Sequence, residues 1–202
     1  MKKEFLPYDI VRDNALKLAA KIYRKGFIPD VIYVSLRGGA YLGNVLSEYF
    51  KVINRKGRPV YYAAVVARSY TDVQKSGQIK VEGWTYAPEH LRIGDKVLLV
   101  DDIFDSGKTI NHLAGIILEK GIPREDLKVA VHDYKYFYDK PDQLPIQPDF
   151  FCRRHEQSIY DEETWIHYMS HELIGLNAEE METYYYRHDG ELRDVFSGLE
   201  WP

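Results

Sequence analysis

Two kinds of apolar pattern alternate along this chain. Short unbroken apolar runs are typical of strands that are buried on both faces of a parallel sheet. Apolar residues that recur every three or four positions predict amphipathic helices. The runs lie at residues 30–35, 59–67, 97–100 and 127–131, and the periodic stretches at 11–22, 41–50 and from Ile110 onward. Strands that alternate with helices in this order predict a doubly wound α/β fold with a mostly parallel sheet.

Two stretches fall outside this alternation. Residues 68–90 contain no clear apolar period, so they predict a lid or a disordered insert, with a polar-tipped β-hairpin as the alternative. Residues from about Asn177 onward are acidic and aromatic. We expect this second stretch to pack back on the domain or on a second subunit, with partner binding as the alternative.

Composition narrows the class of protein. The 202 residues are 45% hydrophobic, which suits one domain with an appendage and a well-filled core. The net charge of -4 and the lack of a basic block argue against a nucleic-acid partner. The single cysteine, Cys152, excludes an internal disulfide, and no apolar segment resembles a signal peptide or a membrane span. A soluble, cytoplasmic protein without a membrane partner is expected.

Candidate chemistry concentrates just after the third apolar run. Asp101 and Asp102 end that run, and a small-residue turn at 105–109 precedes a predicted helix. A strand, a glycine turn and a helix N terminus together present free backbone amides to an anion. The turn is not the phosphate loop of nucleoside triphosphatases, because that motif needs a glycine where Asp102 stands. An acidic strand end with a serine cap is the simpler alternative, but it would not require Asp105 and Gly107.

The stretch 97–110 resembles the phosphoribosyl pyrophosphate signature of type I phosphoribosyltransferases, in which an apolar strand, two acids, two apolar residues and Asp-Ser/Thr-Gly precede a helix. Further similarities over roughly residues 9–172 resemble the 6-oxopurine branch, which acts on hypoxanthine, guanine or xanthine. The resemblance implies transfer of a 5-phosphoribosyl group from phosphoribosyl pyrophosphate to a 6-oxopurine base in purine salvage. It also implies Mg²⁺ as cofactor and a homodimer or homotetramer.

On this resemblance, two loops bind phosphoribosyl pyrophosphate. Their residues are Leu36, Arg37, Gly38, Asp101, Asp102, Ser106, Gly107, Lys108 and Thr109. Arg37 would neutralise the pyrophosphate, since a guanidinium pairs with phosphate oxygens through two hydrogen bonds. The Leu36–Arg37 bond is the candidate for the cis peptide that precedes the basic residue in this family. Asp101, Asp102 and Glu172 would be the metal ligands.

The resemblance assigns the remaining chemistry to three segments. Asp105 would be the catalytic residue, acting as general base or proton partner of the purine imidazole. Lys135 would donate to the 6-oxo group, and Trp165 with Ile166 would form the base-binding segment in which the indole stacks on the purine. A core position is the alternative for Trp165. The dipeptide that follows Arg68, Ser69-Tyr70, is similar to a flexible loop that closes over the reacting centre.

The resemblance also predicts the domain organisation. The phosphoribosyltransferase domain would span residues 1–176, with a small hood from about 136–176, and 177–202 would be an unassigned extension. The segment 168–171 departs from relatives, which have Pro-Trp and an acid there, so the floor of the base pocket is not defined.

Two other functions are compatible with this fold. One is a non-catalytic regulator that senses phosphoribosyl pyrophosphate, although the chain shows no DNA-binding segment or basic face. The other is a transferase for adenine or a pyrimidine, against which Lys135 and Trp165 argue. The choice among hypoxanthine, guanine and xanthine stays open.

Overall fold

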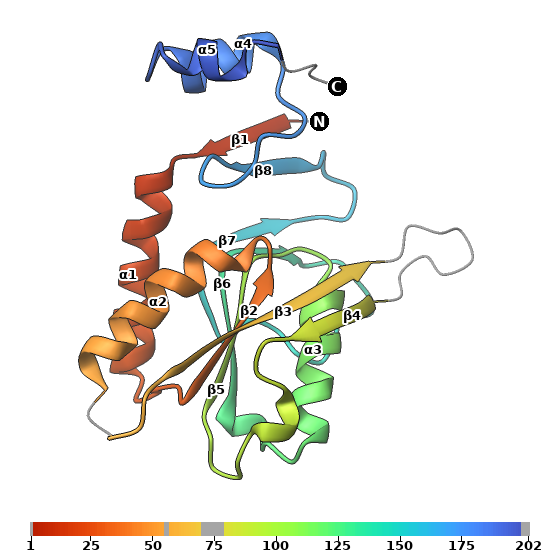
Figure 1. Cartoon of the computed structure of the whole chain (residues 1–202). Coiled ribbons are helices and arrows are strands. Elements are labelled where there is room, and N and C mark those ends of the chain that lie inside the picture. The colour runs from red at the N-terminus through yellow and green to blue at the C-terminus, as the bar shows by residue number, and fades with distance from the viewer. Residues whose placement is uncertain (1, 55–56, 70–78, 199–202) are drawn as a thin grey trace.

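A six-stranded sheet forms the body of the protein (Figure 1). The computed structural model describes residues 2–54, 57–69 and 79–198. The strands lie in the order β4-β3-β2-β5-β6-β7, and every neighbouring pair is parallel except β3 with β4. They are β2 (Val31–Leu36), β3 (Tyr61–Ser69), β4 (Ile79–Trp84), β5 (Val97–Phe104), β6 (Leu127–Phe137) and β7 (Phe150–Gln157).

Helices cover both faces of this sheet (Figure 1). Helices α1 (Tyr8–Arg24) and α2 (Gly39–Ile53) lie on one face, and α3 (Lys108–Glu119) lies on the other. Successive side chains of a strand point to opposite faces, so Ile32 packs with α1 and α2 whereas Tyr33 packs with α3. Two cores result, and the predicted doubly wound α/β fold with a mostly parallel sheet is confirmed.

Two strands run further than their apolar patterns predict. β5 continues past Val100 through the acid pair to Phe104, and β6 continues to Phe137. The two strands keep their parallel pairing over this length, with Phe104 opposite Tyr134. Backbone pairing therefore persists where the side chains become polar, and it places Lys135 within a strand.

The stretch 68–90 contains more structure than its pattern predicts. Within the described residues, β4 pairs antiparallel with β3, as the hairpin alternative predicts. A short 3₁₀ helix, Pro88–His90, follows, and another at Arg124–Asp126 precedes β6. Residues 70–78, including Tyr70 of the predicted flexible loop, lie outside the described residues.

A second sheet forms a small hood above the main one (Figure 1). It pairs β1 (Lys2–Leu6) in parallel with β8 (Thr164–Tyr168). The sequence predicts a hood from residues 136–176 alone, whereas β7 joins the main sheet through its pairing with β6, and β1 supplies half of the hood.

A buried carboxylate connects the hood to the main sheet. Asp133 on β6 is fully buried and accepts hydrogen bonds from His132, His155, Arg153 and the Tyr168 hydroxyl, at 2.6–2.7 Å. Tyr168 belongs to β8 of the hood, whereas the other donors lie on β6 and β7. This one side chain therefore joins three strands from two sheets.

The C-terminal extension packs on the outer face of the hood. It contains α4 (Ala178–Met181), the π-helical turn η3 (Glu182–Tyr186) and α5 (Leu192–Phe196). Tyr184 stacks on Phe5 of β1 with ring centroids 3.8 Å apart, and the Lys3 ammonium donates to the Glu180 carboxylate at 2.7 Å. Packing on the domain, one of the two expected arrangements, is thus observed. None of the helices in the described part of the chain is long and apolar enough to cross a membrane.

Candidate active site

The carboxyl end of β5 carries two acidic side chains at the centre of the sheet. Asp101 accepts a hydrogen bond from the Asp102 amide at 3.1 Å, and Asp102 accepts one from the Ile103 amide at 2.9 Å. Burial, together with the neighbouring Asp102 carboxylate, raises the pKa of Asp101 well above its ordinary value. The two side chains are thus held by local backbone contacts.

The turn after β5 has the geometry expected of an anion cradle. Gly107 has a φ of +75°, and a Cβ there would overlap the Phe104 ring, so glycine is required in this turn. A cavity of about 210 Å³ is lined by the acid pair and the turn. Its polar lining includes Asp105, Ser106 and Thr109. Because the first amides of a helix have no partner within the helix, α3 directs free donors toward this space.

A second loop approaches the first from β2. The Leu36–Arg37 peptide bond is cis, as expected, and it leads into Gly38 and α2. A Cβ on Gly38 would overlap the Asp102 carboxyl group, and a Cβ on Gly39 would lie 2.6 Å from the Val100 carbonyl oxygen. The glycine pair therefore allows the two predicted phosphate-binding loops to come into direct contact.

Lys135 extends from β6 to the same edge of the sheet. Its Nζ lies 3.3 Å from Asp105 Oδ2 and 3.8 Å from Glu163 Oε1, and its side chain is only 6% exposed. Asp105 in contrast is 48% exposed, so its carboxylate is accessible to a ligand. The structure thus brings the predicted catalytic residue and the predicted base-binding lysine into contact.

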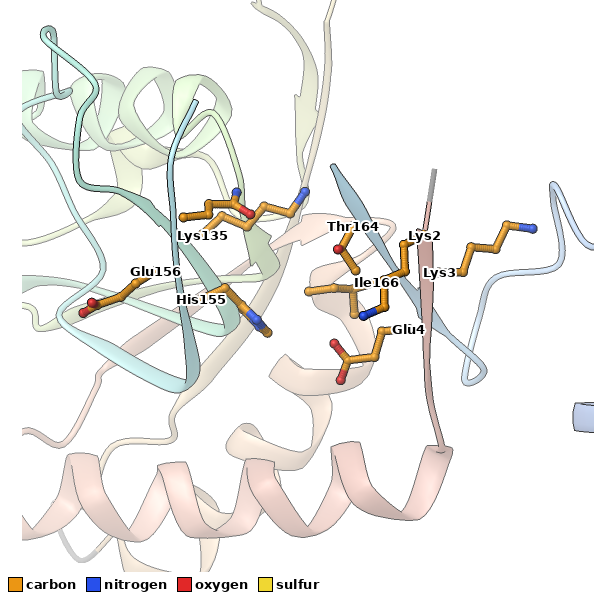
Figure 2. Close-up of a pocket in the computed structure, with 9 residues that line it drawn as sticks. Lys2, Lys3, Glu4, Lys135, His155, Glu156, Thr164 and Ile166 are labelled. Carbon is orange, nitrogen blue, oxygen red and sulfur yellow. The ribbon is translucent and has the colours of Figure 1, made fainter. Parts of the chain in front are cut away.

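A cavity of about 380 Å³ separates the hood from the main sheet and includes Lys135 in its wall (Figure 2). Thr164 and Ile166 of β8 and Glu4 of β1 point from the hood toward His155 and Lys135 (Figure 2). The predicted residues Lys135 and Ile166 therefore meet in one cavity, which is large enough for a flat heterocycle.

Trp165 does not line this cavity. It is 44% exposed, so the alternative of a core position is wrong. Its indole Nε1 donates instead to Glu172 Oε2 at 3.2 Å. Its role in base stacking stays a prediction.

Two of the three predicted metal ligands, Asp102 and Glu172, lie close together. Asp102, His171 and Glu172 place one ligand atom each within 4.8 Å of the others, and within the described residues Asp101 is not part of this group. The carboxylates of Asp102 and Glu172 provide the oxygen ligands that Mg²⁺ requires. His171 was not expected, although it stands in the segment that departs from relatives.

The predicted flexible loop is only partly described. Arg68 and Ser69 end β3, next to the undescribed residues 70–78. Their role as a lid stays a prediction.

Residues 4–136 match the phosphoribosyl transferase domain family. The match spans both glycine loops, the acid pair, Asp105 and Lys135. The chain belongs to this family.

Curated relatives of this phosphoribosyl transferase domain are similar over part of their length. The chain is 31% identical over 121 residues to hypoxanthine-guanine phosphoribosyltransferase of Bos taurus and 29% identical over 121 residues to that of Homo sapiens. Each alignment covers 58% of this chain and 55% of the relative. The chain thus spans about half the length of the curated relatives it matches.

Solved structures share the fold of this phosphoribosyl transferase chain. A purine phosphoribosyltransferase from Pyrococcus horikoshii aligns with a TM-score of 0.64 and 21% identity, over 88% of this chain and 99% of its own. Helicobacter pylori xanthine-guanine-hypoxanthine phosphoribosyltransferase aligns with a TM-score of 0.55 and 18% identity, over 82% and 90%. The family match itself ends before β7, so the hood strand β8 and Glu172 lie beyond it.

Proposed function

We propose that this protein transfers a 5-phosphoribosyl group from phosphoribosyl pyrophosphate to a 6-oxopurine base, releasing pyrophosphate, as part of purine salvage in the cytoplasm. The contact between Asp105, in the anion cradle, and Lys135, in the wall of the hood cavity, supports this proposal most directly. It joins a site suited to a phosphate to a site suited to a base, so that the two substrates would meet at the end of β5.

The phosphate end of the site has the simpler chemistry. The amides at the start of α3 and the hydroxyls of Ser106 and Thr109 would bind the 5′-phosphate, while Asp101 and Asp102 would accept hydrogen bonds from the ribose hydroxyls. Arg37 would pair with the leaving pyrophosphate. As the bond to pyrophosphate breaks, positive charge develops on the ribose, and the nearby carboxylates would stabilise it.

The base end of the site depends on a donor and an acceptor. The Lys135 ammonium would donate to the 6-oxo group, and the exposed Asp105 carboxylate would exchange a proton with the purine imidazole. Ile166 and Trp165 would hold the ring plane.

Mg²⁺ bound by Asp102 and Glu172 would supply positive charge to offset the charge of the pyrophosphate. The segment from Arg68 through Tyr70 would close as a lid over the reacting centre and exclude water from it. We also propose that the protein assembles as a homodimer or homotetramer.

Supplying purified protein with Mg²⁺, phosphoribosyl pyrophosphate and each base in turn tests the proposal. We expect hypoxanthine, guanine or xanthine to be converted to its monophosphate and adenine to react poorly, because an ammonium cannot accept a hydrogen bond from a 6-amino group. Asp105→Asn should lower single-turnover rates about 10²-fold. Preferred turnover of adenine or orotate would contradict the base assignment, and tight binding of phosphoribosyl pyrophosphate without turnover would favour the regulator.

A further inference from the structure

Three side chains with lone-pair donors converge beside the end of β5, and one of them is an imidazole. Their ligand atoms, from Asp102, His171 and Glu172, all lie within 4.8 Å of one another. Carboxylate oxygens suit Mg²⁺, which is a hard cation and favours oxygen ligands. An imidazole nitrogen instead favours first-row transition-metal dications. The group therefore differs from an all-oxygen magnesium site at one position, His171.

The His171 ring is oriented by contacts on three sides. Its Nε2 lies 3.5 Å from Asp102 Oδ2, and its Nδ1 lies 3.0 Å from Ser170 Oγ. The ring also stacks on Tyr168, with centroids 5.4 Å apart and planes inclined by 17°. If Nδ1 carries the proton and donates to Ser170, then Nε2 keeps a lone pair directed at Asp102, which is the arrangement found for metal-binding histidines.

Each carboxylate of the group is anchored through one oxygen. Asp102 Oδ1 accepts from the Ile103 amide at 2.9 Å, whereas its Oδ2 faces His171. Glu172 Oε2 accepts from the Trp165 indole at 3.2 Å and from the Tyr168 amide at 3.3 Å. Such outer contacts fix the direction of metal ligands and raise metal affinity.

The loop that carries Glu172 is held from behind by the C-terminal extension. The Tyr185 hydroxyl donates to the Glu172 carbonyl oxygen at 3.2 Å. The Nδ1 atom of the buried His167 faces the Glu172 carboxylate at 3.5 Å, and it has no hydrogen-bond partner within the described part of the chain. This unpartnered nitrogen is aimed at the Glu172 carboxylate from the buried side of the group.

We propose that His171 is a nitrogen ligand of the divalent cation held by Asp102 and Glu172, and that it shifts the preference of this site from Mg²⁺ toward transition-metal dications such as Mn²⁺. The catalytic role of the cation rests on the proposed function, whereas the metal–nitrogen bond does not. In the competing arrangement a protonated His171 acts as internal counter-ion of Asp102, and no metal–nitrogen bond forms.

Electron spin echo measurements on the full chain with Mn²⁺ and inorganic pyrophosphate distinguish the two arrangements. We expect ¹⁴N modulation from a directly bound imidazole, and we expect His171→Gln to abolish it. The matched control is His112→Gln on the exposed side of α3, which should keep the modulation. Bound Mn²⁺ without ¹⁴N modulation, or no Mn²⁺ binding at all, would overturn the proposal, while turnover with Mg²⁺ could still uphold the proposed function.

Competition between Mn²⁺ and Mg²⁺ provides a second readout. His171→Asp replaces the nitrogen ligand by an oxygen ligand. The variant should therefore still bind Mg²⁺, and its preference for Mn²⁺ over Mg²⁺ should fall about tenfold relative to the native chain. Melting temperatures show whether each variant is folded. An unchanged metal preference in a folded His171→Asp variant would also overturn the proposal.

Discussion

Trp165 has one observed contact and one predicted role, through different atoms. Its indole N–H donates to Glu172, and its ring is the predicted stacking surface for the base. Trp165→Phe keeps an aromatic ring and removes the donor. We expect the Mg²⁺ concentration needed for half-maximal activity to rise about tenfold, because loss of an outer contact of a metal ligand typically has this effect.

The same variant should leave the Michaelis constant for the base close to native. Melting temperature should change little, because the side chain is 44% exposed. Trp165→Ala is the comparison, since loss of a stacking ring costs about 1 to 3 kcal/mol of base binding. A raised Michaelis constant for the base in Trp165→Phe, without a changed Mg²⁺ requirement, would show that the contact with Glu172 is unimportant.

At the site, the sequence predicts residues that share a local motif and misses those that meet only in the fold. Asp105 follows the acid pair at the spacing of the sequence motif, so its place in the turn after β5 is predicted from the sequence alone. His171 lies close to Asp102 only because the loop after β8 folds against the end of β5. No periodicity along the chain encodes that approach. The departure of segment 168–171 from relatives was the available signal.

Two glycines on different helices should respond in opposite ways to the same substitution. At Gly39 an added Cβ would lie 2.6 Å from the Val100 carbonyl oxygen and 2.9 Å from Asp101 Cα, and backbone atoms cannot rotate away. Gly39→Ala should therefore destabilise the protein by about 1 to 3 kcal/mol. Gly115 in α3 has open space around its Cβ position, and Gly115→Ala should stabilise by about 0.5 to 1 kcal/mol.

Urea unfolding of both variants measures these changes. Equal effects of the same sign would mean that helix propensity, rather than the approach of α2 to β5, determines the outcome.

Among the elements, those with strong apolar periodicity are predicted outright, whereas β1 is not predicted and β4 is predicted only as the hairpin alternative. The helices and central strands belong to two large cores, so their patterns are long and clear. β1 is half-exposed along most of its length and finds its partner, β8, at the other end of the chain. β4 is similarly an exposed edge strand. Their pairing depends on tertiary context rather than on local pattern.

For the whole molecule, Asp133 should determine part of the response of stability to acid. Burial opposes ionisation of Asp133, but hydrogen bonds from His132 and His155 outweigh it, so the pKa of Asp133 lies below its ordinary value. A depressed pKa contributes stability that is present above the unfolded-state pKa, about 3.9, and is lost as the pH falls through the folded-state pKa. We expect the free energy of unfolding to fall below about pH 4.

Urea unfolding between about pH 3 and about pH 6 tests this expectation. Asp133→Asn should be less stable than the native chain by about 3 kcal/mol at neutral pH, because Arg153 loses a buried partner, and its stability should depend less on pH. Asp142→Asn, in the exposed loop between β6 and β7, is the matched control and should keep the native slope. An unchanged slope in Asp133→Asn would exclude this carboxylate as the acid-sensitive group.

The pairing of β1 with β8 also imposes an order on folding during translation. These strands lie about 160 residues apart, so at ribosomal rates of about 5 to 20 residues per second β1 waits roughly 8 to 30 s for its partner to be made. β2, β3, β5 and β6 can pair within that interval. Nascent chains stalled before residue 164 should therefore resist protease across these four strands, whereas residues 2–6 should be cleaved. Protection of residues 2–6 in these chains would contradict this order. The nascent protein would thus form the proposed phosphate-binding loops before it forms the hood that bounds the proposed base cavity.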